Sequence, residues 1–118
     1  MTALWDAVKN KFARHDIALT FLPLVSRVGN GNSGSLGVAA PVVNFEVTVT
    51  VAGTTLAVTL EESDDGSTWV AVGAAVNQNG AGTSARAYRA VTRRFFRFSY
   101  AQTGANYTFS VTGETKGG

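Results

Sequence analysis

From residue 45 to residue 111 the hydrophobic and polar side chains of this chain alternate with a period of two. Such alternation is typical of half-buried β-strands, because successive side chains of a strand point to opposite faces of its sheet. We expect strands within six segments, residues 45–51, 56–61, 69–72, 85–91, 94–100 and 107–111. Turns rich in Gly, Asn and Asp separate them, which favours antiparallel pairing. The pattern predicts an all-β protein, an antiparallel β-sandwich of jelly-roll type over residues 42–115.

The apolar positions of these strands predict the hydrophobic core. Residues on one face of a strand point to the same side, so the apolar members of each run should meet between the two sheets. The expected core residues are Phe45, Val47, Val49, Leu56, Val58, Leu60, Trp69, Phe96, Phe98, Phe109 and Val111.

The period changes near the N-terminus. Leu4, Val8 and Phe12 are spaced four residues apart, Trp5 lies beside them, and Thr2 is placed to cap a first turn. This spacing predicts a short amphipathic helix over residues 2–15. A helix of this length is not stable alone in water, so its apolar face should dock on the rest of this chain or on a neighbouring molecule.

Residues 17–41 follow neither period, and we interpret them as an extended arm. Gly29, Gly31 and Gly34 have the GxGxxG spacing of dinucleotide sites. No βαβ unit surrounds them, so a flexible Gly/Asn/Ser loop is the better interpretation. The sequence therefore divides into a helix and Gly-rich arm (residues 1–41) and a β-sandwich domain (residues 42–115).

Composition narrows the chemistry. The 118 residues hold no cysteine and one histidine, His15. Disulfides, iron–sulfur clusters and cysteine nucleophiles are thereby excluded. Because no credible nucleophile–base pair is evident, we expect no enzyme activity, no cofactor and no bound metal. Charged residues are 15% of the chain and the net charge is +2, which excludes a disordered polyelectrolyte and a general polyanion binder.

Four carboxylates cluster at Glu61, Glu62, Asp64 and Asp65. Oxygen ligands this close could bind Ca²⁺, but their spacing lacks the alternation of a calcium loop. A hairpin turn with solvated carboxylates, with Gly66 supplying the positive φ, is the better interpretation. Nothing in the cluster implies the facing carboxylates of a glycosidase.

Five arginines fall within twelve residues, interleaved with aromatic residues. They are Arg86, Arg89, Arg93, Arg94 and Arg97. Basic and aromatic residues together can bind single-stranded nucleic acid. The alternation directs Phe96 and Phe98 into the core, so nucleic-acid binding is disfavoured. The arginines should instead pair with the acidic turn or with a partner protein.

No run reaches the roughly 18–20 apolar residues of a membrane-spanning helix, and the longest, residues 17–25, contains Pro23. A basic stretch precedes this run, as in a signal peptide, but a small-residue cleavage site is missing. We therefore expect a protein made and kept in the cytoplasm, without a membrane partner.

Three stretches carry a family resemblance: GNSGSL at residues 31–36, LEESDDGSTW at residues 60–69, and RFFRF at residues 94–98 leading to YTFSVTGE at residues 107–114. Over residues 28–115 the chain resembles the small β-sandwich virion proteins of tailed bacteriophages. It departs from their usual pattern at Phe96 and Phe98, where aliphatic residues are expected, and in the Trp-bearing N-terminal helix.

The resemblance implies a non-enzymatic virion structural role, most often as a decoration or cement subunit on the capsid exterior. We expect a capsid decoration protein that binds and stabilises the outer surface of the major capsid protein lattice, as a homo-oligomer with a trimer favoured. A tail or head–tail connector component and a carbohydrate-binding adhesion module are the alternatives. The candidate partner interface comprises Leu4, Trp5, Val8, Phe12, Arg86, Arg89, Arg93 and Arg94.

Overall fold

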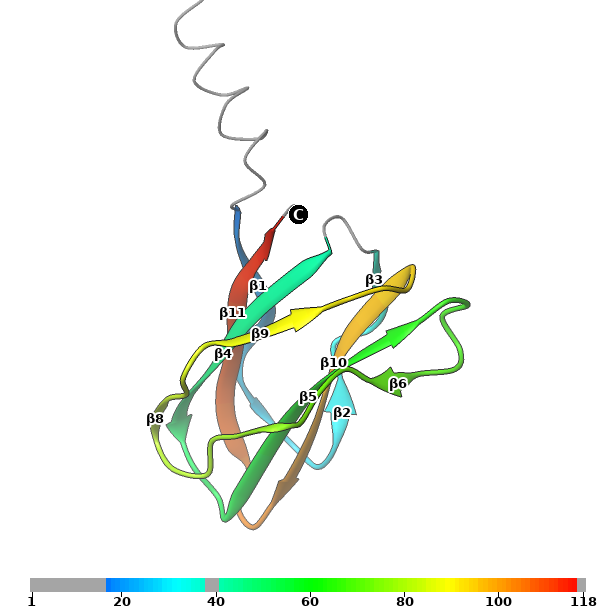
Figure 1. Cartoon of the computed structure of the whole chain (residues 1–118). Coiled ribbons are helices and arrows are strands. Elements are labelled where there is room, and N and C mark those ends of the chain that lie inside the picture. The colour runs from blue at the N-terminus through cyan, green and yellow to red at the C-terminus, as the bar shows by residue number, and fades with distance from the viewer. Residues whose placement is uncertain (1–16, 38–40, 117–118) are drawn as a thin grey trace, which may run out of the picture.

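A computed structural model describes residues 17–37 and 41–116 of the chain, and these residues form eleven strands and no helix (Figure 1). The strands are β1 Ile17–Arg27, β2 Gly31–Asn32, β3 Leu36–Gly37, β4 Val42–Val51, β5 Thr55–Ser63, β6 Val70–Ala71, β7 Val76–Asn77, β8 Gly82–Thr83, β9 Ala87–Ala90, β10 Phe95–Thr103 and β11 Tyr107–Lys116. The prediction of an all-β, sandwich-like fold is confirmed for this part of the chain.

The strands form two antiparallel sheets. In the first, here called sheet A, the order is β1-β11-β4, and both β8 and β9 pair with the other side of β4. In the second, sheet B, β10 pairs with β5; β2 and β3 lie along the free side of β10, and β6 and β7 along that of β5. Long strands thus form the centre of each sheet, and short ones form three of the four edges. The fourth edge is β1.

The core lies between the sheets, where alternate residues of the long strands meet. Every predicted core residue except Trp69 is buried, with at most 3% of its surface exposed. Leu22, Val43, Val91 and Tyr107 complete the buried set. Within it Phe98 packs against Phe21 and Phe45, with ring centroids 4.7 and 4.8 Å apart.

The structure differs from the sequence prediction at residues 17–27, which form a full edge strand rather than an arm. β1 pairs with β11 from Ile17 opposite Thr115 to Arg27 opposite Tyr107. Its register shifts twice, between Thr20 and Leu22 and again before Val25. Each shift exchanges the inward and outward faces, so the strand has no period of two in its sequence. The sandwich therefore includes residues that the predicted boundary at residue 41 left outside it.

The predicted glycine-rich loop also contributes strands. β2 pairs with Ser99 and Tyr100 of β10, and β3 pairs with Phe95 and Phe96. The helix predicted over residues 2–15, with Leu4, Trp5, Val8 and Phe12, lies outside the described residues.

Candidate interaction surfaces

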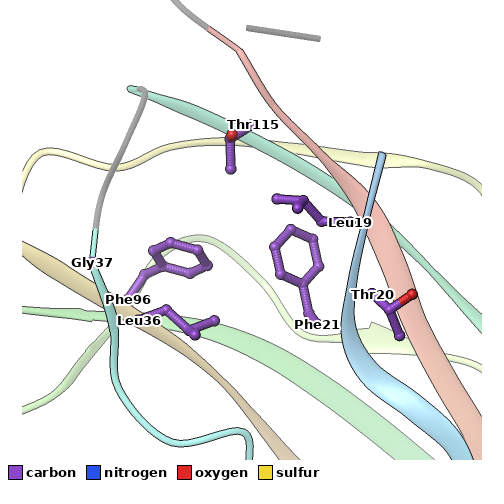
Figure 2. Close-up of a pocket in the computed structure, with 7 residues that line it drawn as sticks. All are labelled: Leu19, Thr20, Phe21, Leu36, Gly37, Phe96 and Thr115. Carbon is purple, nitrogen blue, oxygen red and sulfur yellow. The ribbon is translucent and has the colours of Figure 1, made fainter. Parts of the chain in front are cut away.

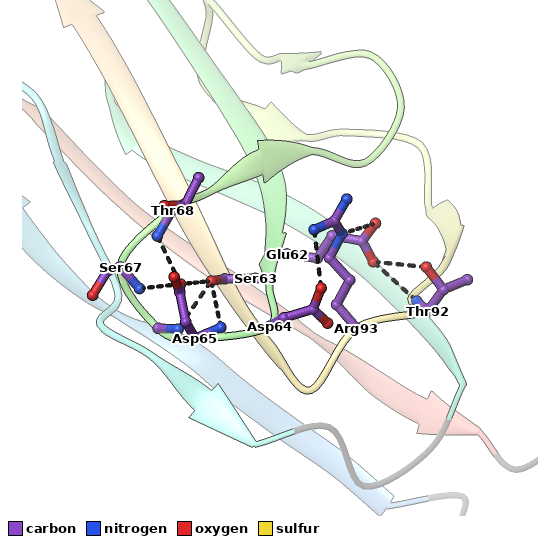
Figure 3. A network of polar contacts seen from close by, with 9 residues as sticks. Glu62, Ser63, Asp64, Asp65, Ser67, Thr68, Thr92 and Arg93 are labelled. Atoms are coloured by element: carbon purple, nitrogen blue, oxygen red, sulfur yellow. Dashed lines mark hydrogen bonds and ion pairs between the residues drawn. The ribbon is translucent and has the colours of Figure 1, made fainter.

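The turn after β5 is closed by the side chains of Ser63 and Asp65 (Figure 3). The Asp65 carboxylate accepts hydrogen bonds from the backbone N–H groups of Ser67 (2.8 Å) and Thr68 (2.9 Å) and from the Ser63 hydroxyl (2.9 Å). Gly66 takes the positive φ of 78° predicted for it. These donors, Thr68 N–H foremost, lower the pKa of Asp65 to about 2. The turn was predicted from the sequence with solvated carboxylates, and the structure adds that the Asp65 carboxylate holds this turn together.

Arg93 joins this turn to the segment that follows β9. Its Nη1 lies 3.2 Å from Asp64 Oδ2, and its Nε lies 3.6 Å from Glu62 Oε2. The other oxygen of Glu62 accepts the backbone N–H of Thr92 at 2.9 Å. The predicted pairing of arginines with the acidic turn is confirmed here (Figure 3).

Trp69, predicted in the core, lies on the outer face of sheet B. Ala71 pairs with the outward-facing Glu61, and Trp69, two residues before Ala71, shares that face. The Arg97 guanidinium lies 4.4 Å from the Trp69 ring centroid and bonds Glu61 at 2.8 Å. The indole is thus half-buried beneath an ion pair. The core prediction for Trp69 was wrong because the residue precedes β6 on the outer face of the sheet.

Arg86 belongs to the outer face of sheet A. Its Nη1 donates to the buried Asn44 side chain at 2.7 Å and lies 3.4 Å from Glu114, and its Nη2 lies 3.5 Å from Glu46. Arg86 therefore pairs with two carboxylates, Glu46 of β4 and Glu114 of β11, and donates to the buried amide oxygen of Asn44 on β4.

Arg89 and Arg94 differ from the paired arginines. The Arg89 guanidinium donates to the backbone carbonyls of Tyr88 and Ala74, at 3.0 and 2.9 Å, and bonds no carboxylate among the described residues. Arg94 is exposed, and its guanidinium lies 5.6 Å from the Phe95 ring centroid. The structure therefore distributes the four predicted interface arginines over two sheets, most of them in intramolecular contacts.

Arg27 is a buried arginine that no pattern in the sequence singles out. Only 8% of it is exposed, and its guanidinium donates to the carbonyls of Pro23 (2.7 Å), Val25 (3.1 Å) and Phe109 (2.9 Å). It lies 4.6 Å from the Phe109 ring centroid. Desolvation lowers the pKa of Arg27. Arg27 thus provides donors at the register shift, where the backbone ladder of β1 and β11 is interrupted.

An apolar pocket of about 240 Å³ lies between the sheets at the end where β1 begins (Figure 2). Its described lining residues are Leu19, Thr20, Phe21, Leu36, Gly37, Phe96 and Thr115. None of these is charged. The pocket joins the edge strand of sheet A to the β3 edge of sheet B.

Further apolar residues are exposed along β1 and just after it. Leu24, Val25 and Val28 have 50%, 46% and 78% of their surface exposed.

Residues 17–37 and 41–116 contain no cluster of three His, Cys, Asp or Glu side chains suited to a metal ion. Within these same ranges no helix is present that could span a membrane.

Comparisons with known proteins place the fold but not a family. No family model matches the chain, and no curated protein matches it. Among solved structures, the SPBc2 prophage-derived protein YomS is similar with a TM-score of 0.51 and 10% identity, over 83% of this chain and 91% of that one. A CBM4 structure aligns with a TM-score of 0.41 and 12% identity, over 84% of this chain and 66% of that one. The first likeness supports a shared fold, and the second is too low to carry an argument.

Proposed function

We propose that this chain is a non-enzymatic structural protein of a bacteriophage virion. The supporting observation is the sandwich fold, which a prophage-derived protein shares over 91% of its length. The sequence resemblance to small β-sandwich virion proteins points the same way. The first line rests on backbone topology and the second on short sequence motifs.

The described polar groups support a structural rather than a catalytic role. Glu61 and Glu62 pair with arginines, Asp64 pairs with Arg93, and Asp65 accepts backbone donors. A catalytic base needs a proton within reach that belongs to a substrate, whereas these carboxylates stabilise the fold. Function should therefore reside in surfaces that bind other proteins.

Within the virion, the proposed station is the capsid exterior. There the chain acts as a decoration subunit that binds the major capsid protein lattice as a homo-oligomer, with a trimer favoured. The proposed contacts are the apolar N-terminal residues, between copies, and the exposed Arg94 side of the sandwich, towards the capsid. A small subunit held by several such contacts gains affinity through avidity.

The decisive experiment measures association with particles. Particles from an induced lysate are purified by density gradient, separated into heads and tails, and probed for this protein by mass spectrometry. Decoration predicts stoichiometric amounts on heads, release by mild chaotrope, and rebinding of the purified full-length protein. Detection on tails alone would replace decoration by a tail or connector role. Absence from all particles, with the protein abundant in the lysate, would contradict the virion proposal.

A deletion variant then tests the N-terminal contacts. Residues 2–16 can be removed without touching β1, whereas removal up to residue 27 would delete an entire strand of sheet A. The shorter deletion should leave a folded sandwich that no longer decorates heads. Charge reversal of the exposed Arg94, compared with that of the paired Arg86, tests the capsid-facing side.

The carbohydrate-binding alternative receives no support from the aromatic residues. Such modules stack sugars on exposed rings, but Trp69 is covered by Arg97. Tyr88 is 61% exposed and lies on strand β9 rather than at a loop end. A glycan array with the full chain checks this point directly.

A further inference from the structure

The apolar pocket has the size of a protein side-chain anchor. Small-molecule sites usually enclose about 300–1,000 Å³ and place a few polar groups around their ligand. This pocket measures about 240 Å³ and offers mainly hydrocarbon surface. In Figure 2 Leu36 and Leu19 line the pocket beside Phe21 and Phe96, and these two rings meet edge to face at an interplanar angle of 81°. Their ring centroids are 5.9 Å apart. Pockets of this kind receive an aromatic or aliphatic anchor from a protein partner.

The chain itself carries a segment of matching chemistry. The sixteen residues that precede β1 include Leu4, Trp5, Val8 and Phe12, which would form one apolar stripe on the helix predicted over residues 2–15. The pocket lies where those residues join the sandwich, because Leu19 and Phe21 line it and Ile17 begins the strand. A helix of three or four turns gains most of its stability from packing, so the stripe requires a covering surface.

The spacing between the predicted helix and β1 decides which molecule supplies that surface. The helix is predicted to continue to residue 15, and β1 begins at Ile17, which leaves one connecting residue. Connections between helices and strands usually take two to six residues, and one residue cannot reverse the chain direction. From this spacing we expect the apolar stripe of one molecule not to reach the pocket of that same molecule.

We propose that the pocket between β1 and β3 receives the N-terminal apolar stripe of a second copy of this chain. The inference rests on the homo-oligomer of the proposed function and names the site at which its copies meet. Each copy donates one segment and accepts one, so the contacts close into a symmetric dimer or ring without leaving an apolar surface free. Phe12, the last residue of the stripe, or Trp5 supplies the anchor that enters the pocket and packs against Phe21 and Phe96.

The absence of cysteine from the chain allows a direct test in full-length protein. Two single variants are prepared, an epitope-tagged Phe12→Cys and an untagged Thr115→Cys, the latter on the pocket rim. They are mixed, allowed to exchange, and treated with a short bismaleimide. A Val28→Cys variant serves as the matched control, because Val28 is exposed and directly follows β1, at the end of the strand away from Leu19, up to about 30 Å away at 3.3 Å per residue.

The proposal predicts at least about fivefold more tagged–untagged heterodimer with Thr115→Cys than with Val28→Cys. Equal yields, or no heterodimer, would overturn it. So would a double variant, Phe12→Cys with Thr115→Cys, that is cross-linked within single molecules at high dilution, because this result would show docking in the same chain.

A second measurement uses no cross-linker. By light scattering, Phe12→Ser should lower the oligomeric mass to that of a monomer, whereas Asn10→Ser, on the opposite side of a helical wheel, should not. An unchanged mass for Phe12→Ser would refute the exchange. Both measurements need no phage particle, so a closed oligomer that fails to bind heads would contradict the proposed function and leave this inference standing.

Discussion

Replacing Arg27 by Met should destabilise the sandwich more than any other arginine substitution in the described part of the chain. Met keeps the apolar length of the side chain and removes the guanidinium. Three carbonyls then lose a charged donor, and the one on Phe109 is buried where water cannot replace it. The carbonyls of Pro23 and Val25 are partly accessible to water.

The magnitude follows from these environments. An unsatisfied buried carbonyl costs about 1–3 kcal/mol, and each partly accessible hydrogen bond contributes about 0.5–1.5 kcal/mol. Relief of the desolvation of a buried cation offsets part of this loss, since Arg27 has no carboxylate partner among the described residues. We expect the free energy of unfolding to fall by about 2–4 kcal/mol, a large part of the 5–15 kcal/mol typical of a domain.

Urea denaturation followed by circular dichroism measures this change. Arg97→Met is the matched control, because Arg97 lies on an outer face in an ion pair whose two side chains remain 24% and 21% exposed. This replacement should lower the free energy of unfolding by only about 0–1 kcal/mol. Arg27→Lys should fall between the two, since an ammonium cannot reproduce the planar fork of donors. If Arg27→Met unfolds at the same urea concentration as Arg97→Met, the guanidinium is not what secures the register shift of β1.

Three other substitutions test separate parts of the fold. Phe98→Ala should cost about 3–5 kcal/mol by urea denaturation, because the ring is fully buried against two other rings, whereas Tyr88→Ala on the surface should stay within about 0.5 kcal/mol of the parent. Near-neutral Phe98→Ala would mean that the core is misplaced. The fold lowers the pKa of Asp65 to about 2, whereas the pKa in the unfolded chain is near 4. The ionised carboxylate therefore stabilises the fold at pH values above about 4, and this contribution is lost as the pH falls towards 2. The Tm of Asp65→Asn should accordingly fall less between pH 5 and pH 2.5 than that of the parent, and parallel curves would contradict this. Gly113→Ala should prevent soluble expression, because an added Cβ would overlap the backbone of β4, while Gly37→Ala, with nothing within 4 Å of its Cβ position, should express normally.

The sequence predicted the central strands well because their alternation is uninterrupted. β4, β5, β10 and β11 each present one apolar face to one core, so period two maps directly onto burial. The edge strand β1 could not be predicted in the same way. Its two register shifts and Pro23 break the alternation, and Pro is tolerated there because an edge strand has one side without ladder bonds.

The candidate interface was predicted only as a group of residue types. Sequence proximity suggested a single basic surface, but neighbouring residues of a strand face opposite sides, and chain turns separate the rest. Arg86 consequently lies over sheet A and Arg93 beside the acidic turn of sheet B. Arg27 gave no signal, because its role depends on a carbonyl of Phe109 that is 82 residues away.

The geometry of β1 also constrains how this protein associates. A long edge strand with exposed apolar residues is a site where another strand could add to the sheet. Pro23 has no N–H to donate, the carbonyls of Pro23 and Val25 already accept Arg27, and two register shifts bend the strand. A regular ladder with a second chain is therefore disfavoured along the half of β1 that follows Thr20. Association should instead use side chains, with anchors entering the pocket beside Leu19 and Phe21.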